Sequence, residues 1–531
     1  MKKRAMNIIM IIMLVASFIP PVPAKAAVSR EIRVGLTSMY SQKNEIRINN
    51  TKISLGYLDG RVFSPEANFN SASGFIFKPA TEYYIDLGIE LTSYAAVLKR
   101  IAELPTLGIR ISGAVTGHGE WHIYAGGFAD RQEAESAVKS LNESGTECAL
   151  LPGNSYRVKL EWGESKILID VDEDFEYPQV EGLSAYEGVT GLVDMGSRVY
   201  RGRIEIGRYG RTGLTAVNVV ELEEYLYSVV SSEMPASWPK EALKAQAVAS
   251  RSYALVKGGI GGASDAQNGW RMNDTTDYQV YRGYLYEKPE TTEAVKMTEG
   301  ETVNYNNKVV AAYYFSSGGG STESSEAVWG VDLPYLTSMP DFFEGRFAIS
   351  PWREVFTLDE LTSLLSGFTS SLGDVTGISA VKTSPSGRVS LLRVTGTGGS
   401  LSLQTSAIRN VLGVKGTKFK TVRYGDEPDR VYVKNSGNEA VSKNLNGCTV
   451  LSANGTSSLS SDKMSQYVVR SADNLTVFGA SAPDSPDEIW LYGLGSGHGV
   501  GMSQTGAAGM AEEGFTYKEI LEYYYLGCKV L

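Results

Sequence analysis

The stretch VVSSEMPASWPKEALKAQAVASRSYAL, residues 229–255, decides the predicted fold. It places a single carboxylate, Glu233, in a short polar break between two helical patterns. After the break, an alanine-rich helix is predicted from Pro239, a favoured first-turn residue, to the glycine pair at 258–259. Before it, apolar residues recur at helical spacing and predict one buried face: Leu222, Tyr225, Leu226, Val229 and Val230.

Glu233 is placed where the pKa of its carboxyl should rise. Met234 precedes Pro235 and therefore favours an extended backbone, so Glu233 should end the first helix. The partial negative charge at a helix C-terminus disfavours a carboxylate, and burial beside Met234 and Trp238 acts in the same direction. A raised pKa suits a general acid at neutral pH. A solvated loop glutamate is the plain alternative.

The N-terminus has the pattern of an export signal. Three basic residues precede an apolar run over 6–19, and A-x-A at 24–26 forms a cleavage site. An uncleaved membrane anchor is the alternative. Because cleavage removes four basic residues and no acid, the formal charge changes from −10 to −14. So acidic a chain is a poor nucleic-acid binder, which points to a neutral or polar substrate.

Cysteine and histidine are too scarce for most metal or disulfide chemistry. The three cysteines lie far apart, and the chain contains no C-x-x-C pair. Only three histidines occur, and G-x-S-x-G is missing, which argues against a serine nucleophile elbow. We therefore expect neither a metal nor another cofactor.

The 531 residues are enough for roughly two to four domains, and the mixed patterns predict a multi-domain α+β protein. The expected segments are a signal peptide (1–26), a strand-rich N-terminal region (27–118), a small α/β module (119–160), connecting strands (161–194), and a larger mixed domain (195–531) with a β-rich insertion (423–490).

The small module has a strand–helix–strand–strand pattern, with Asp130 as the expected N-cap of its helix. Its run from Trp121 to Ala134 resembles the sporulation-related repeat domain, which binds peptidoglycan glycan. An ordinary α/β piece without a ligand is the alternative.

Two polar stretches offer further candidate residues. NDTTDYQVYRG, residues 273–283, supplies Asp274, Asp277 and Gln279, although a turn capped by Asp and Asn side chains would look the same. YYFSSGGGSTESSEAVWG, residues 313–330, supplies Ser317 and Glu323, while its tryptophan could stack on a sugar or lie in the core.

A glycine-rich stretch precedes the C-terminal helix. Glycine occupies every second position from 493 to 501, which in an extended chain leaves one face bare for a flat ligand or a closely packed helix. His498, Ser503 and Gln504 are the polar groups at its end. The capping box at 516–519 then predicts a helix ended by Gly527.

Four blocks in this order resemble the stage II sporulation protein D / amidase-enhancer family of bacterial cell-wall proteins. They are the block around Glu233, DTTDYQVYRG, AAYYFSSGGGSTESSEAVWGVDLPYLTSMPD and GHGVGMSQTGAAGMAEEGFTYKEILEYYYLG. The resemblance covers roughly residues 195–422 and 490–531. It implies a lytic transglycosylase that cleaves the MurNAc–GlcNAc bond in glycan stripped of stem peptides. Glu233 takes the catalytic position, and the other candidates would line the glycan groove.

A lytic transglycosylase can work with one carboxylate, whereas an ordinary glycosidase needs two. Glu233 would protonate the glycosidic oxygen and then accept the proton of the muramyl C6 hydroxyl, which closes on C1. Some relatives carry a Cys/His zinc site near this segment. Here neither residue type occurs between Cys148 and Cys448, which supports the expectation of no metal.

Three other functions stay open from the sequence. The chain could be a non-catalytic wall-binding partner that stimulates a cell-wall amidase. It could be a scaffold of the spore engulfment machinery. It could also be a polysaccharide hydrolase that pairs Glu233 with Glu323 or Asp277.

Overall fold

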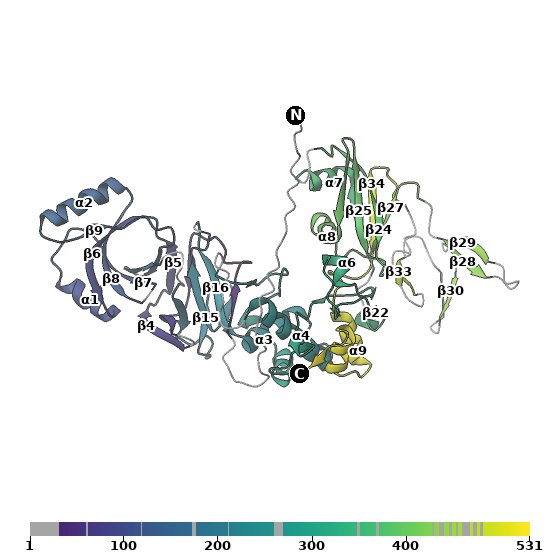
Figure 1. Ribbon diagram of the computed structural model, residues 1–531, viewed down its shortest axis with the longest axis horizontal. Helices are drawn as coiled ribbons and strands as arrows, with labels where there is room; N and C mark the ends of the chain where they lie inside the picture. Colours follow the sequence, from purple (N-terminus) through teal and green to yellow (C-terminus); the bar gives the residue numbers. More distant parts are fainter. Residues whose placement is uncertain are drawn as a thin grey trace, which may run out of the picture.

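The computed structural model describes residues 31–59, 62–117, 119–171, 177–210, 212–259, 269–347, 351–367, 371–426 and 482–531, with strand backbones between 430 and 477. The predicted signal peptide lies outside this part of the chain. Helices and several sheets mix along the chain, which confirms the α+β class. Figure 1 shows the small module at one end, helices in the centre and a second β-rich region at the other end. Of the helices described, none is long and apolar enough to cross a membrane.

A seven-stranded sheet joins the N-terminal strands to the larger domain. β1 (Glu31–Gly35) pairs antiparallel with β16 (Thr215–Glu221), so the sheet crosses the expected segment boundaries. Burial is nearly complete along β16, as expected for a central strand. The order is β17-β1-β16-β15-β12-β3-β4, with β17 at Met272–Asn273, β15 at Arg203–Gly207, β12 at Gln179–Gly182, β3 at Lys52–Asp59 and β4 at Val62–Asn70.

The small module is inserted between two paired strands. β5 (Phe75–Pro79) and β10 (Val158–Trp162) pair antiparallel, and the module leaves the sheet between them. Asp130 caps its second helix as predicted, accepting hydrogen bonds from the backbone N–H groups of residues 132 and 133. The module consists of β6 (Tyr83–Leu91), α1 (Tyr94–Glu103), β7 (Ile111–Thr116), β8 (Trp121–Phe128), α2 (Arg131–Glu143) and β9 (Ala149–Leu150).

An eight-stranded sheet, β2-β5-β10-β11-β7-β8-β6-β9, contains both the module and its host strands. β2 spans Ile46–Ile48, and β11 spans Ser165–Asp170. β11 pairs antiparallel with β10 and parallel with β7, so it joins the module to the host. The module is therefore fixed on both sides rather than tethered by a linker.

Two central helices carry the stretch around Glu233. α3 (Leu222–Glu233) buries the predicted apolar face, and α4 (Lys240–Gly258) begins after Pro239 and ends at Gly259 as predicted. α4 lies between two hydrophobic cores. Ala247 and Ala254 belong to the core under the seven-stranded sheet, while Ala245 and Ala249 belong to the core with the C-terminal helices. Alanines on both faces permit this close packing.

The C-terminal helices are α9 (Gln504–Glu512) and α10 (Tyr517–Tyr524). The predicted capping box of Thr516 and Glu519 is present, but α10 ends before Gly527. Smaller elements around them are β13 (Leu192–Asp194), β14 (Val199–Arg201), η1 (Tyr284–Tyr286), α5 (Pro289–Met297), β18 (Val303–Tyr305), β19 (Lys308–Val309), β20 (Tyr314–Phe315), β21 (Gly320–Ser321), α6 (Ser325–Trp329), β22 (Pro340–Asp341), η2 (Gly345–Phe347), β35 (Met502–Ser503) and β36 (Lys529–Val530).

A second β-rich region has its own hydrophobic core. β27 (Phe419–Arg423) and β34 (Glu488–Gly493) pair antiparallel, and the predicted insertion leaves between them. The region's other elements are β23 (Trp352–Thr357), α7 (Leu358–Leu365), β24 (Val375–Thr383), β25 (Val389–Gly396), β26 (Ser400–Gln404) and α8 (Thr405–Leu412). The insertion contains three hairpins among its described strands: β28 (Arg430–Lys434) with β29 (Ala440–Asn444), β30 (Thr449–Ser452) with β31 (Gly455–Ser458), and β32 (Val468–Arg470) with β33 (Leu475–Val477).

The alternating glycines do not form the predicted bare extended face. At 495, 497, 499 and 501 the backbone φ lies between 68° and 99°, a region that an extended strand does not visit. A side chain at Gly497 would meet Phe315, and one at Gly501 would meet the Tyr313 carbonyl oxygen. The prediction of an extended face was wrong because the chain turns at these glycines and packs them against itself: residues 495, 497 and 501 against 313–319, and Gly499 against Arg388.

Two glycines allow α9 to pack closely against β22 and the segment that follows it. A Cβ at Gly506 would lie 2.2 Å from Asp341 Oδ1, and one at Gly509 would lie 1.5 Å from the Phe343 carbonyl oxygen. Because real Cβ atoms do not approach so closely, α9 can adopt this position only with glycine there. The first residue of α9 is Gln504, so this contact also fixes where the Gln504 side chain begins.

We expect Gly509→Ala to lower the free energy of unfolding by about 1–3 kcal/mol, because the added methyl must displace backbone. Chemical denaturation of purified protein measures the change. Gly377→Ala is the matched control, since a Cβ at Gly377 has nothing within 4 Å, and it should stay within ~0.5 kcal/mol of the parent. Equal stability of the two variants would contradict the packing described.

Candidate active site

Glu233 is the last residue of α3, and three donors hold its carboxylate. Met234 after it is extended, with φ −129° and ψ 139°, as the following proline predicts. The Val280 backbone N–H donates to Oε1 at 2.9 Å, and Gln504 Nε2 donates to Oε2 at 3.2 Å. The Tyr314 hydroxyl is the third donor. Three segments distant in sequence therefore meet at one half-buried carboxyl group.

Burial raises the pKa of Glu233 above its ordinary value, in the direction that the sequence predicts. The hydrogen bonds from Val280, Gln504 and Tyr314 oppose this shift because they favour the ionised carboxylate, and so does the positive charge of Arg282. The net shift is upward. Glu233 thus keeps its proton to a higher pH than an ordinary glutamate does, and hydrogen-bond donors are in place once the proton leaves.

A buried hydrogen-bond chain fixes the direction in which Tyr314 donates. The Tyr225 hydroxyl donates to Gln279 Oε1 at 3.2 Å, which sets the orientation of that amide. Gln279 Nε2 then donates to the Tyr314 hydroxyl oxygen at 2.9 Å. This oxygen accepts from Gln279 and also neighbours Ser250, and the hydroxyl hydrogen is the one that serves the Glu233 carboxylate.

Gln504 is positioned in a similar way by α4. Its Nε2 lies 3.4 Å from Gln246 Oε1, while Gln246 Nε2 donates to Ser250 Oγ at 2.9 Å. Gln246 and Ser250 are both fully buried. The amide of Gln246 therefore presents its oxygen to Gln504, and Gln504 presents its nitrogen to Glu233.

We expect Tyr314→Phe to raise the pKa of Glu233 further, because it removes a donor that favours the ionised form. Carboxyl ¹³C NMR of glutamate-labelled protein measures this pKa, with Glu233→Gln to identify the resonance. Tyr523→Phe is the control, since the Tyr523 hydroxyl donates instead to the Pro340 carbonyl oxygen. An unchanged or lowered pKa in Tyr314→Phe would show that this hydroxyl does not donate to the carboxylate.

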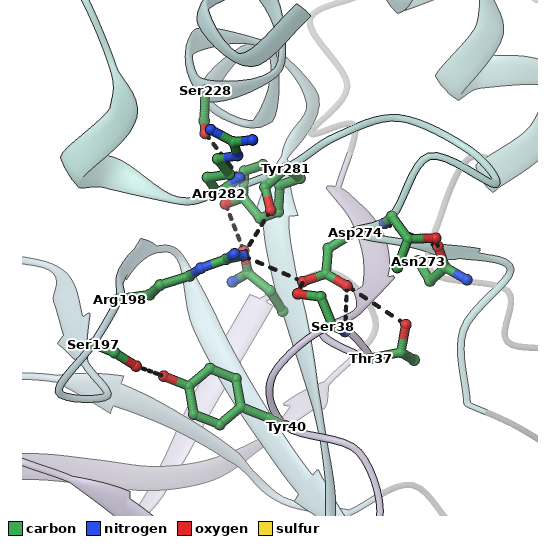
Figure 2. Close-up of polar contacts among 12 residues, drawn as sticks. Thr37, Ser38, Tyr40, Ser197, Arg198, Ser228, Asn273, Asp274, Tyr281 and Arg282 are labelled. Carbon is green, nitrogen blue, oxygen red and sulfur yellow. Dashed lines mark hydrogen bonds and ion pairs between the residues drawn. The ribbon is translucent and has the colours of Figure 1, made fainter. Parts of the chain in front are cut away.

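Asp274, a predicted groove residue, has a structural role. It is 3% exposed and accepts hydrogen bonds from the backbone N–H (2.9 Å) and the hydroxyl of Ser38, while Arg198 lies 3.4 Å away (Figure 2). Figure 2 shows these partners reaching its carboxylate from two segments, the loop after β1 and the turn that carries Arg198. Asp274 therefore joins the loop after β1 to the segment that leads to Val280.

The other residues of that segment have different positions. Gln279 is fully buried and acts on Glu233 through Tyr314. Asp277 is exposed in the turn, where its backbone N–H donates to Thr275 Oγ1 at 3.2 Å. Of the candidates in this segment, only Asp277 has a side chain open to solvent.

Ser317 and Glu323 each form buried hydrogen bonds with other side chains of the protein. Ser317 Oγ donates to Glu344 Oε1 at 2.5 Å. Glu323 is 2% exposed and accepts from Ser386 Oγ at 2.5 Å and from Ser384. Both side chains are thus engaged inside the protein, and their contact with a glycan stays a prediction.

His498 and Ser503 are also engaged by the protein itself. His498 Nδ1 accepts from the Val500 N–H at 3.1 Å, and its ring packs among Phe315 and Trp329. Burial lowers the pKa of His498 to about 3, so the imidazole is neutral at physiological pH. Ser503 is buried and caps α9 through the Gly506 N–H. Gln504 is the predicted groove residue that contacts Glu233 directly.

Several residues around Glu233 are not predicted from the sequence: the Val280 backbone, Tyr314 and Arg282 beside it, and Gln246 and Tyr225, which act through other side chains. Tyr314 and Arg282 lie within blocks that the sequence singles out, but Tyr314 stands beside another tyrosine, and no pattern marks Arg282. Nothing in a linear pattern says which hydroxyl turns toward the carboxylate. In the described part of the chain, His, Cys, Asp and Glu form no group of three or more that could hold a metal ion.

Comparison with known proteins agrees with this architecture. Residues 210–305 match the family described as "Stage II sporulation protein", and residues 79–152 match the SPOR domain, beginning earlier than the predicted module. Stage II sporulation protein D of Bacillus subtilis (strain 168) is 29% identical over 334 residues, covering 60% of this chain and 77% of that protein. The amidase enhancer of the same organism is 30% identical over 311 residues, covering 57% of this chain but only 39% of that protein.

The SPOR match implies peptidoglycan binding, and the two domains together imply a cell-wall location. The chain thus carries a SpoIID domain with a SPOR domain N-terminal to it, and its relatives include stage II sporulation protein D and amidase enhancer, as the sequence resemblance predicts.

Proposed function

We propose that this protein is a peptidoglycan lytic transglycosylase exported to the cell wall, with a role linked to sporulation. It would cleave MurNAc–GlcNAc bonds in strands stripped of stem peptides and leave 1,6-anhydro ends. The observation that carries the proposal is the half-buried carboxyl of Glu233, whose pKa is raised and whose two oxygens accept from Val280 and Gln504.

The donors around Glu233 suit both halves of such a reaction. Protonated Glu233 first gives its proton to the glycosidic oxygen, and positive charge develops at the muramyl C1. The new carboxylate is stabilised at once by Val280, Gln504 and Tyr314, which are already in place and need no reorganisation. Glu233 then takes the proton of the C6 hydroxyl as that oxygen bonds to C1, which returns the acid to its starting state.

The two carboxylates named as rivals differ in whether they are free to act beside Glu233 as the second group of a hydrolase. Glycoside hydrolysis uses a pair about 5–9.5 Å apart, one of them able to reach water or the sugar. Glu323 is buried and held by two serine hydroxyls. Asp277 is exposed, so it remains the candidate for a second carboxylate. Product analysis distinguishes the two reactions, because hydrolysis leaves no anhydro ring.

Glu233→Gln should lower the rate of anhydromuramyl product formation by about 10²–10⁴-fold, since glutamine cannot donate the proton. Purified protein would be incubated with peptide-stripped glycan and the products identified by mass spectrometry. Glu290→Gln, an exposed change on α5, is the charge-matched control and should behave as the parent. Undiminished cleavage by Glu233→Gln would exclude Glu233 as the acid.

The pH dependence follows from the direction of the pKa shift. Because the first step needs protonated Glu233, the rate should fall as pH rises through its raised pKa. In Tyr314→Phe the alkaline limb of the profile should move to higher pH, in parallel with the carboxyl titration. A limb that moves to lower pH, or does not move, would mean that another group sets it.

A non-catalytic partner of a cell-wall amidase is the second candidate, favoured by the 30% identity to the amidase enhancer. Under this alternative, neither the parent nor Glu233→Gln would cleave glycan. Both would still bind it, and both would stimulate an added amidase equally.

A further inference from the structure

Arg282 is an exposed cation placed beside Glu233 by the helix that carries Glu233. Its backbone N–H donates to Ser228 Oγ at 3.2 Å, a contact visible in Figure 2. Four residues on, the Tyr286 carbonyl oxygen accepts from Ser231 Oγ at 2.7 Å. Ser228 and Ser231 are one turn apart on α3, so the 282–286 segment is fastened at two points to the last turns before Glu233.

The guanidinium of Arg282 is held in place but has no acidic partner. It lies over the Tyr286 ring, 5.0 Å from the centroid, in a cation–π contact. Neighbouring arginines differ: Arg201 pairs with Glu287 at 2.7 Å, and Arg251 pairs with Glu223 at 2.7 Å. In the described residues, no carboxylate comes within ion-pair distance of Arg282. An ordered, exposed and unpaired guanidinium is suited to a planar anion such as a carboxylate.

We propose that Arg282 is a specificity-determining residue that binds the free lactyl carboxylate of the muramyl sugar whose bond is cleaved. This inference rests on the proposed function. The muramyl C1 must lie at Glu233, so the lactyl group of the same ring lies within a side chain's reach of it. In peptide-stripped glycan the lactyl carboxylate is the only charged group of the repeat. With a stem peptide attached, the same position is a neutral amide.

This assignment gives a physical reason for a preference for stripped strands. A carboxylate can form two parallel hydrogen bonds to the guanidinium, while an amide offers one weaker acceptor. The chain's formal charge of −10 by itself favours a neutral or polar substrate, so binding of an anionic strand needs a local cation such as Arg282. Arg282 therefore supplies discrimination, and Glu233 supplies proton transfer.

The test uses the full chain carrying Glu233→Gln, so that no turnover occurs, and two glycans. One is peptide-stripped glycan, and the other is the same material with its lactyl carboxylates converted to N-methylamides. Hydrogen–deuterium exchange reports protection of residues 278–290 as glycan concentration rises. Protection within residues 79–152 reports any binding by the SPOR domain separately.

We expect half-maximal protection of 278–290 at about tenfold lower concentration of the acid form than of the methylamide. Adding Arg282→Gln to the Glu233→Gln protein should remove this tenfold difference, and adding Arg282→Lys should leave part of it. Arg271→Gln, which removes another exposed cation, should leave the ratio unchanged.

Equal protection by the two glycans, no protection of 278–290 by either, or an unchanged ratio in Arg282→Gln would overturn the inference. Failure of the proposed function is a separate result. In that case the parent protein produces no 1,6-anhydro ends, whatever the concentration ratio between the two glycans. If the concentration ratio depends on Arg282 but the parent protein does not cleave glycan, the contact between Arg282 and the lactyl carboxylate stands and the proposed transglycosylase activity fails.

Discussion

The hydrogen bonds that converge on Glu233 are the constraint on which the rest of the site depends. They join the end of α3, the segment at 279–282 and the start of α9, which are distant in sequence. A carboxylate taken from water into a half-buried place needs such partners, since burial alone would hold it neutral. The partners also decide what the group can do: they leave the acid strong enough to give its proton and ready to take one back.

The scaffold around this carboxylate is built for fixed geometry. Alanines on both faces of α4 let it lie between two cores, and glycines at 506 and 509 let α9 pack against backbone. Gln504 begins α9, so its position is set by these contacts rather than by a mobile loop. A site held by helix ends and buried amides meets the accuracy that proton transfer requires.

The SPOR domain is inserted into the sheet rather than appended to the chain. It leaves and re-enters between paired strands β5 and β10, while β11 pairs with both host and module. The eight-stranded sheet that holds it is separate from the seven-stranded sheet, and residues of both sheets share one hydrophobic core, so a ligand bound there would be attached to the SpoIID domain through packed side chains. This arrangement favours presenting a glycan strand at a set distance from Glu233.

Local structure was predictable from the sequence where one short segment determines it. Helix α3, its end at Glu233 and the Thr516 capping box follow from apolar spacing, a proline and a cap. Long-range partners were not predictable. Asp274 meets Ser38 across 236 positions, so a motif residue that looked like a ligand contact is a structural one. The glycine run misled because positive φ leaves no trace in an alternating pattern.

The central claim is that a single carboxylate suffices because the substrate's own hydroxyl, and not water, closes the reaction. The most direct measurement is cleavage of peptide-stripped glycan in H₂¹⁸O, with mass spectrometry of the new muramyl ends. The account predicts 1,6-anhydro ends without ¹⁸O. Reducing ends that carry ¹⁸O at C1 would contradict it, since they require a second group near Glu233 that activates water.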